Sequence, residues 1–362
     1  MKPPPRNIVC LVRRWAHHTD SGGYDRLARE VGAKIVARRT GQSWVRRLEE
    51  FLWWRFPRNR GYLFGYEYVD WFAEASIIVR SWFQRIDAVH VLYGENQLDL
   101  LLRRRRLLRA PLVVTFHVPA HRLRERFEEV QKHLRSGIDA AIVNARCQVP
   151  DFQRWFGAER VVFMPHGIDT TRFRPSGPPP TGAALRILTV GEHMRDWAAL
   201  DGIVEQCHRR GLAVTFDIVG WDYVLPFAAT APTVTLHPRL PEETLVRLYG
   251  SADALLLPVT DATATNAALE SLACGTPVIS NRVGGMLDYV DEHCGWFFEK
   301  GEVLAIVDLL EAFAKDRSLG LSRREAARRK ALECDWSRIA RQMLAVYDAV
   351  ASHRPPGEGL PD

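Results

Sequence analysis

Thr265, Asn266 and Glu270 are residues whose types and spacing suit the binding of a charged ligand. Thr265 and Asn266 favour the start of a helix, where backbone N–H groups lack partners and the helix dipole adds partial positive charge. A phosphate or pyrophosphate would fit there. Glu270, about one turn further along, could accept hydrogen bonds from paired hydroxyls such as those of a ribose, or could be an ordinary solvated carboxylate.

The elements that must position these residues form a strand–helix–strand unit. An apolar strand is predicted over residues 254–257, and the helix that follows can end at Gly275 in the left-handed conformation. A second strand begins at Val278. Strands joined in this way are parallel by default, and such sheets bind ligands at the carboxyl ends of their strands. Gly284 and Gly285 then allow backbone to approach a ligand closely.

The run from Leu269 to Ile279, followed by Val283-Gly284-Gly285, resembles the donor-site signature of retaining GT-B glycosyltransferases of family 4, the glycosyltransferase group 1 superfamily. The similarity is good in the C-terminal half and patchy in the N-terminal half. It implies an α/β fold of GT-B architecture, in which two doubly wound, Rossmann-like domains face a central cleft.

The residue pattern and the resemblance together predict seven donor-binding residues: Gly22, Gly23, Arg195, Asp261, Thr265, Asn266 and Glu270. Gly22 and Gly23 form a turn after the first predicted strand, where the family carries a similar turn that faces the donor. The family usually places an Arg and then a Lys after the first strand of the second sheet, but Glu192 stands in the first place. Arg195 is therefore expected to serve the donor diphosphate alone, or else to be a surface residue paired with Asp196.

A further departure from the family concerns the first acidic residue of the signature. Many family 4 enzymes carry a Glu at the position occupied here by Ala262, where it approaches hydroxyls of the transferred sugar. Asp261 lies one residue away and can replace it only if the surrounding loop follows a different path. Otherwise backbone groups of residues 264–266 must hold the sugar alone.

His117 is the predicted catalytic residue. It follows a strand predicted over residues 112–116, and this strand resembles the one that carries the active-site histidine of many family 4 enzymes. The chemistry favoured in the family is front-face attack, in which the leaving phosphate takes the acceptor proton. His117 would then orient the sugar, and neither a protein nucleophile nor a metal ion is expected to be needed. A purely structural histidine is the alternative.

The length of 362 residues and the hydrophobic content of 47% suit two globular domains. The start of the chain lacks the apolar core of a signal peptide, and no window approaches the roughly 20 apolar residues of a membrane span. A cytoplasmic protein is therefore expected. Six scattered cysteines without a Cys-x-x-Cys pair argue against a disulfide framework and a zinc site. His17 and His18 are expected to lie in a solvated loop.

Basic charge is concentrated in the first half of the chain. Residues 1–176 carry 31 Lys and Arg against 18 Asp and Glu, whereas residues 177–362 carry 18 against 25. Residues 43–86 add many aromatic side chains among arginines. This pattern indicates either peripheral contact with an anionic membrane, on the inner face, or core helices in an arginine-rich chain without such a partner. No binding motif accompanies the charge, so nucleic acid is not an expected partner.

The predicted N-terminal, acceptor-side domain spans residues 1–175, and the C-terminal nucleotide-sugar donor domain spans 185–335. A Pro/Gly linker joins them over residues 176–184. The helical pattern over 336–351 resembles the last helix of the family, which crosses back to the first domain. Residues 352–362 are expected to form a disordered tail.

The expected activity is transfer of a hexose-like sugar from a nucleoside diphosphate sugar, with retention, to an unknown acceptor, which is a glycan, a lipid-linked molecule or a small molecule. The missing phosphate-binding cations leave a second function open, a non-catalytic member that binds nucleotide sugar or a scaffold of a glycan assembly complex. A phosphorylase or sugar-phosphate synthase of the same architecture is less favoured, because the extra anion-binding basic residues are not evident.

Overall fold

The computed structural model describes residues 6–13, 23–37, 47, 66, 68–125, 127, 137–178, 180–220, 230–238, 240–358, 360 and 361. The chain forms two compact units, of which the first comprises Met1–His166 with Trp336–Asp362 and the second comprises Gly167–Asp335. Each unit is built on a parallel sheet of six described strands. Within the described ranges, no helix is both long and apolar enough to cross a membrane.

The sheet of the first unit has the strand order β2-β1-β3-β4-β5-β6. Its strands are β1 (Ile8–Val12), β2 (Lys34–Ala37), β3 (Ala88–Val91), β4 (Leu112–Phe116), β5 (Ala140–Val143) and β6 (Val161–Phe163). The helices of this unit are α1 (Asp25–Glu30), α3 (Tyr68–Phe83), α4 (Asp99–Arg103), α6 (Val149–Phe156) and α13 (Trp336–Ala351), with the short 3-10 helices η1 (Arg105–Leu107), η2 (Arg146–Gln148) and η3 (Ala158–Arg160). The central strands are rich in Val, Ile and Ala and are buried along their whole length, as expected of parallel strands covered on both faces.

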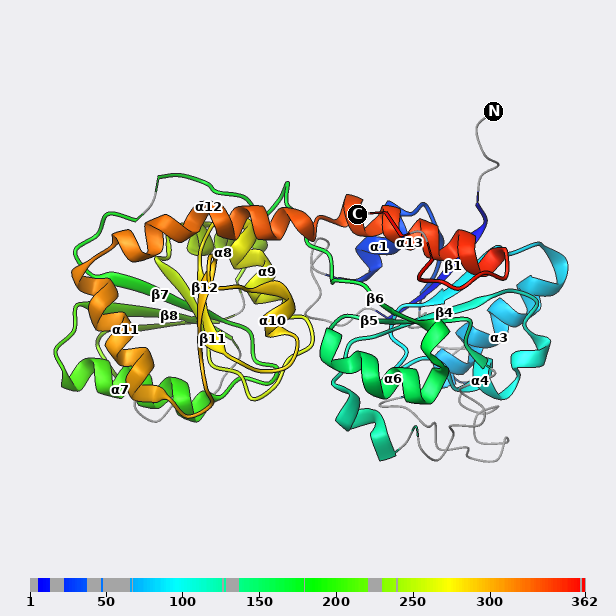
Figure 1. Cartoon of the computed structure of the whole chain (residues 1–362), viewed down its shortest axis with the longest axis horizontal. Helices are drawn as coiled ribbons and strands as arrows, with labels where there is room; N and C mark the ends of the chain where they lie inside the picture. Colours follow the sequence, from blue (N-terminus) through cyan, green and yellow to red (C-terminus); the bar gives the residue numbers. More distant parts are fainter. Residues whose placement is uncertain are drawn as a thin grey trace. The chain divides into compact units, whose positions relative to one another are not determined.

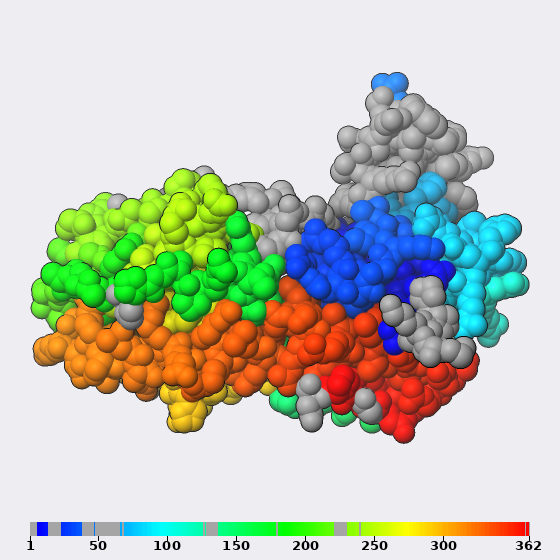
Figure 2. Space-filling view, turned by 90° about the horizontal axis from the view of Figure 1, so that it is seen from above, coloured from blue at the N-terminus to red at the C-terminus, as the bar shows by residue number. Residues whose placement is uncertain are grey.

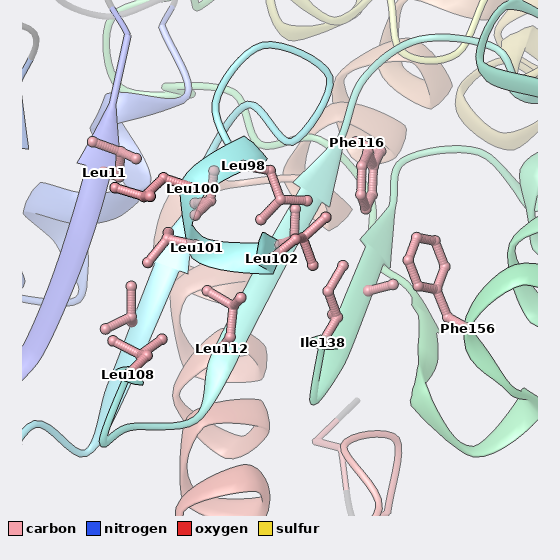
Figure 3. Close-up of a cluster of buried hydrophobic side chains, with 14 of the residues drawn as sticks. Leu11, Leu98, Leu100, Leu101, Leu102, Leu108, Leu112, Phe116, Ile138 and Phe156 are labelled. Carbon is pink, nitrogen blue, oxygen red and sulfur yellow. The ribbon is translucent and has the colours of Figure 1, made fainter. Parts of the chain in front are cut away.

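Two apolar cores lie on opposite faces of this sheet. Helices α3, α4 and α6 cover one face, and α1 and α13 cover the other (Figure 1). On the first face the leucines of α4 pack toward Leu112 of β4, with Ile138 and Phe156 beside them (Figure 3). Helix α13 owes its place to residues spaced three or four apart, which give it one apolar side.

A buried polar link also ties α13 to the sheet of the first unit. His90 of β3 lies with its Nδ1 2.7 Å from the hydroxyl of Tyr347 on α13, and with its Nε2 2.8 Å from Oγ1 of Thr115. Burial lowers the pKa of His90 to about 3, so the ring is neutral. Figure 2 shows the surface of residues 23–37, in blue, next to the red-orange surface of α13. The end of the chain is therefore an integral part of the first unit.

The sheet of the second unit has the strand order β12-β11-β10-β7-β8-β9. Its strands are β7 (Leu185–Val190), β8 (Val214–Val219), β9 (Val234–His237), β10 (Ala254–Leu257), β11 (Val278–Asn281) and β12 (Gly295–Phe298). Its helices are α7 (Trp197–Arg209), α8 (Glu242–Ser251), α9 (Asn266–Ala273), α10 (Met286–Tyr289), α11 (Val303–Lys315) and α12 (Ser318–Glu333). Helices α7 and α11 cover one face, and α8, α9 and α12 the other (Figure 1).

The division between the units differs from the predicted boundary at residue 175. It falls between His166 and Gly167, because the segment after Gly167 is anchored in the second unit. The backbone N–H of Ile168 donates to the carbonyl of Cys334 at 2.8 Å, and Phe173 is buried in the core formed with α8 and α9. The Pro/Gly-rich stretch that suggested a later boundary follows this anchor.

The expectation of a disordered tail over residues 352–362 is corrected for its described part. Residues 352–358 form turns, Pro356 is buried, and Leu360 packs against the core that contains α13. The side-chain amide of Gln342 also donates to the carbonyl of Pro361 at 3.0 Å. The apolar side chains of the tail therefore continue the packing of the helix that precedes them.

Candidate functional site

The strand–helix–strand unit predicted around Glu270 is confirmed. Strand β10 ends at Leu257, α9 begins at Asn266, and Gly275 adopts a φ of +74° just after the helix. Thr265 has the extended backbone of an N-cap residue, but its side chain makes no capping hydrogen bond; its hydroxyl lies 3.5 Å from the sulfur of Met286 instead. Asn266 is exposed in the first turn. The start of α9 thus lies at the carboxyl ends of β10 and β11.

Gly284 and Gly285 bring a second loop against the first. The N–H of Gly285 donates to the carbonyl of Ala262 at 2.8 Å, and Gly284 has a φ of +48°. A Cβ at Gly284 would overlap the Ala262 carbonyl oxygen and lie 2.7 Å from Oδ1 of Asp261. Only glycine fits this approach, which holds the loop of Asp261 beside the loop after β11.

Asp261 turns its carboxylate toward the backbone of its own loop. Its Oδ1 accepts the N–H of Ala262 at 2.7 Å, and the same oxygen faces Gly284. The side chain of Ala262, at the position where many family members carry Glu, is buried in the apolar core of the second unit. The structure thus places Asp261 next to the expected site, while the position of the usual first acid is filled by a methyl group.

Glu270 is a buried carboxyl group, so the interpretation as an ordinary solvated residue is wrong. Only 8% of Glu270 is exposed, and the hydroxyl of Tyr249 on α8 donates to its Oε2 at 2.8 Å. Burial raises the pKa of Glu270 to about 7, an effect that the Tyr249 hydrogen bond opposes and the charge of Glu242 reinforces. The carboxyl group therefore changes charge near neutral pH.

Arg195 is held by the turn between β7 and α7. Its Nη2 and Nε donate to the carbonyl of Val190 at 2.7 and 3.2 Å, and its Nη1 donates to that of His193 at 3.0 Å. Asp196, the alternative partner, caps α7 by accepting the N–H of Ala199 at 3.0 Å. Burial lowers the pKa of Arg195 to about 10, which leaves the guanidinium charged at neutral pH.

Backbone hydrogen bonds join the Arg195 turn to the loop of Asp261. The N–H of Thr260 donates to the carbonyl of Met194 at 2.9 Å, and the N–H of Asp196 donates to that of Pro258 at 2.8 Å. The charge of Arg195 also acts on Tyr249, the partner of Glu270. The predicted donor residues of the second unit therefore lie on adjoining loops at the carboxyl ends of β7, β10 and β11.

His117 lies in the first unit at the carboxyl end of β4, where it is held by Glu95. Oε2 of Glu95 accepts the backbone N–H of His117 at 3.2 Å, and Oε1 lies 3.4 Å from the Nδ1 of its ring. The side chain of His117 is 17% exposed and that of Glu95 is 6% exposed. The carboxylate accepts from the backbone and lies beside the ring, a position from which it can orient the imidazole.

Aromatic rings complete the surroundings of His117. The rings of Tyr24 and Tyr93 each lie with their centroids 4.7 Å from that of His117, and Tyr24 also contacts His166 and Trp336 at 5.2 and 5.4 Å. Tyr24 follows Gly23 directly, so the predicted glycine turn leads into this cluster. Gly23 is buried, whereas Gly22 and the His17-His18 pair lie outside the described residues.

Sequence reasoning missed Glu95, Tyr93 and Tyr249. Tyr93 and Glu95 follow β3, the strand that pairs with β4, so parallel pairing of two neighbouring strands could have brought them to His117. Tyr249 lies on α8, and no local pattern in the sequence connects it with Glu270.

Comparison with protein families and with known proteins identifies the family and the fold. The model described as "Glycosyltransferase Family 4" matches residues 22–172, and the model described as "Glycosyl transferases group 1" matches residues 184–316. Among solved structures, sucrose-phosphate synthase from Thermosynechococcus elongatus superposes with a TM-score of 0.71 at 16% identity, over 96% of this chain and 100% of that chain. Anabaena HepE in complex with UDP and glucose gives 0.69 at 15%, over 96% and 100%. The fold is GT-B, and the chain belongs to glycosyltransferase family 4.

The curated relatives are more similar in sequence than these solved structures, but the matches cover only part of them. A D-inositol 3-phosphate glycosyltransferase of Xylanimonas cellulosilytica is 26% identical over 243 residues, which are 60% of this chain and 58% of that protein. One from Corynebacterium urealyticum is 32% identical over 125 residues, 34% and 29% of the two chains. One from an Arthrobacter species is 25% identical over 314 residues, 75% and 74%. The match thus spans less than two thirds of the first two relatives.

Proposed function

We propose that this protein transfers a hexose-like sugar from a nucleoside diphosphate sugar to an acceptor, with retention at the anomeric carbon. The observation that carries the proposal is the position of Glu270, buried against Tyr249 on the helix whose first turn carries Thr265 and Asn266. A carboxylate held one turn inside a helix N-terminus suits a ribose next to a phosphate group. The solved complexes of HepE with UDP and with UDP-glucose make UDP-sugars the first donors to test.

The proposed mechanism uses fixed charges. As the donor bond breaks, negative charge grows on the leaving diphosphate, and the start of α9 together with Arg195 would stabilise it. Asp261 would face hydroxyls of the transferred sugar, and the turn of Gly22 and Gly23 would approach the donor through its backbone. No metal ion is assigned a role.

His117 is proposed to orient the transferred sugar. The leaving phosphate takes the acceptor proton in a front-face reaction, so His117 does not act as a base. The position of Glu95 supports this role, because a carboxylate 3.4 Å from Nδ1 can orient the ring and leave Nε2 for the sugar.

The acceptor is a glycan, a lipid-linked molecule or a small molecule, and the proposal includes peripheral contact with an anionic membrane. The basic excess of the first half of the chain supports that contact. The alternative function, a non-catalytic nucleotide-sugar-binding member or scaffold of a glycan assembly complex, is favoured by two observations. Three donors of Arg195 already bond to backbone carbonyls, and Glu192 replaces the usual first cation.

A screen of nucleoside diphosphate sugars tests the proposal. A donor present at 100 times its dissociation constant should raise the free energy of unfolding by about 2.7 kcal/mol, which thermal melts detect. The best donor is then assayed for release of the free nucleotide, with and without candidate acceptors. Stabilisation without turnover would favour the non-catalytic alternative, and no stabilisation by any donor would contradict both.

A further inference from the structure

An exposed apolar surface lies at the end of α3 and on η1 in the first unit. Phe83 is 86% exposed, Val79 57%, Trp82 49% and Leu107 43%. The spacing of three and four residues places Val79, Trp82 and Phe83 on one side of α3. The indole N–H of Trp82 donates to the carbonyl of Leu107 at 2.7 Å, so the two elements present one continuous surface. We call these four residues, with the arginines described next, the α3–η1 patch.

Exposed arginines accompany the apolar side chains: Arg80, Arg85, Arg104, Arg106 and Arg109. The guanidinium of Arg109 lies 4.2 Å from the centre of the Trp82 ring, and its backbone N–H donates to Ser81 at 3.1 Å. Arg85 pairs with Asp87 at 3.1 Å. The arginine-rich run and the aromatic side chains therefore belong to the same part of the surface.

The neighbouring arginines of the same run have a different role. Arg103 pairs with Asp99 at 2.8 Å, and Arg105 pairs with Asp139 at 2.7 Å while donating to the carbonyl of Gly137. These two cations are neutralised within the fold. The other arginines of the run are exposed and carry their positive charge on the surface: Arg104, Arg106 and Arg109.

We propose that the α3–η1 patch seats the first unit on an anionic lipid bilayer. Phe83, Trp82 and Leu107 enter the headgroup region, and the arginines contact lipid phosphates. Charge complementarity favours this partner. Phe83 is highly exposed and lies among arginines, and this combination suits the boundary between acyl chains and anionic headgroups. The inference locates the membrane contact that the proposed function includes, at the C-terminal end of the aromatic segment 43–86 and on the arginine-rich run that follows β3, and it does not depend on sugar transfer.

The test is binding of the full chain to phosphatidylcholine vesicles with and without phosphatidylglycerol, at low and high salt. The chain should bind only the vesicles that contain phosphatidylglycerol, and high salt should weaken binding because it shortens the Debye length. Phe83→Ser should weaken binding on the order of tenfold. Arg106→Gln should weaken it about fivefold.

Matched control variants lie in the second unit. Leu321 is 46% exposed and Arg329 lies on the exposed side of α12, so Leu321→Ser and Arg329→Gln should leave vesicle binding unchanged. Absence of binding to anionic vesicles at low salt, or equal binding by wild type and Phe83→Ser, would overturn the proposal. Salt-sensitive binding of the patch to an acidic protein with none to vesicles would identify a protein partner and overturn it as well.

The donor screen separates this inference from the proposed function. Phe83→Ser should be stabilised by the same nucleotide sugars as the wild type, because Phe83 lies outside the predicted donor site. A chain that binds vesicles through the patch but responds to no donor would contradict the proposed function and leave this inference standing.

Discussion

Glu270 is expected to make donor binding sensitive to pH. Its pKa of about 7 means that the carboxyl group is protonated in acid and charged above neutrality. A charged acceptor bonds a hydroxyl more strongly than a neutral one, so donor affinity should fall about fivefold as the pH drops through this value. Glu270→Gln should have low affinity at every pH, and titration calorimetry with the best donor on both proteins measures the difference. Equal affinity for the variant and the wild type would remove Glu270 from the donor site.

An independent check on the Glu270 carboxyl group comes from stability without ligand. Its folded pKa is raised above the ordinary value of 4.5, so the unfolded chain releases this proton first and the native state loses stability as the pH rises from about 5 to about 7. Glu270→Gln removes this contribution. Melting curves should therefore show the variant gaining stability relative to the wild type at the higher pH. A constant difference in Tm across the range would show that the carboxyl group does not titrate there.

Glu95 should act on turnover through His117. His117→Ala is expected to lower kcat strongly and to leave nucleotide affinity nearly unchanged, since the loss falls on contacts made in the transition state. Glu95→Ala should behave similarly because it releases the ring, whereas Glu95→Gln keeps an acceptor for the backbone N–H and should retain more activity. Steady-state kinetics of the three variants, with nucleotide affinity as the internal control, test the relation. Wild-type turnover in Glu95→Ala would show that the carboxylate does not position the histidine.

At the scale of elements, Gly284 should be the least replaceable residue of the loop after β11. A side chain there meets the carbonyl of Ala262 and must also adopt a φ of +48°. Gly301 offers a matched control, because it has a φ of +89° with open space around its Cβ position. Gly284→Ala should lower the free energy of unfolding by about 1 to 3 kcal/mol more than Gly301→Ala does. Similar losses in urea titrations would mean that the loop can shift away.

Local pattern was sufficient to predict the strand–helix–strand unit around Glu270, and it failed where distant residues meet. Strand β10 begins and ends as predicted, and Gly275 follows the end of α9. Runs of apolar residues and the turn residues between them determine these features within a few positions. Tyr249 and Glu270 are 21 residues apart and belong to different helices. Glu95 and His117 are 22 apart and follow different strands. Such pairs depend on how elements pack, and single-sequence patterns carry little of that information.

The boundary between the units likewise could not be predicted from a local sequence pattern. Proline and glycine after Ser176 have the composition of a linker, but what ends a unit is the last residue anchored in it. The hydrogen bond of Ile168 to Cys334 and the burial of Phe173 assign residues 167–175 to the second unit. The composition of the stretch after Ser176 carries no information about the carbonyl of Cys334, which is distant along the chain.

For the whole molecule, the separate cores predict which fragments fold. Residues 167–335 contain both cores of the second unit, so this fragment should unfold cooperatively by itself. Residues 1–166 lack α13 and expose the part of one sheet face that α1 does not cover, so they should fail to fold or should aggregate. Near-ultraviolet circular dichroism and limited proteolysis of both fragments test this. A stably folded 1–166 fragment would show that α13 is dispensable.

The same dependence on α13 sets an order of events during synthesis. A ribosome makes the strands of the first unit early, yet Trp336 and Tyr347, which cover them, are translated only after the whole second unit. The second unit can reach its native state on the nascent chain while the first still lacks α13 and has part of its sheet bare. The first unit is therefore expected to mature after the second, and it is the unit that chaperones must shield.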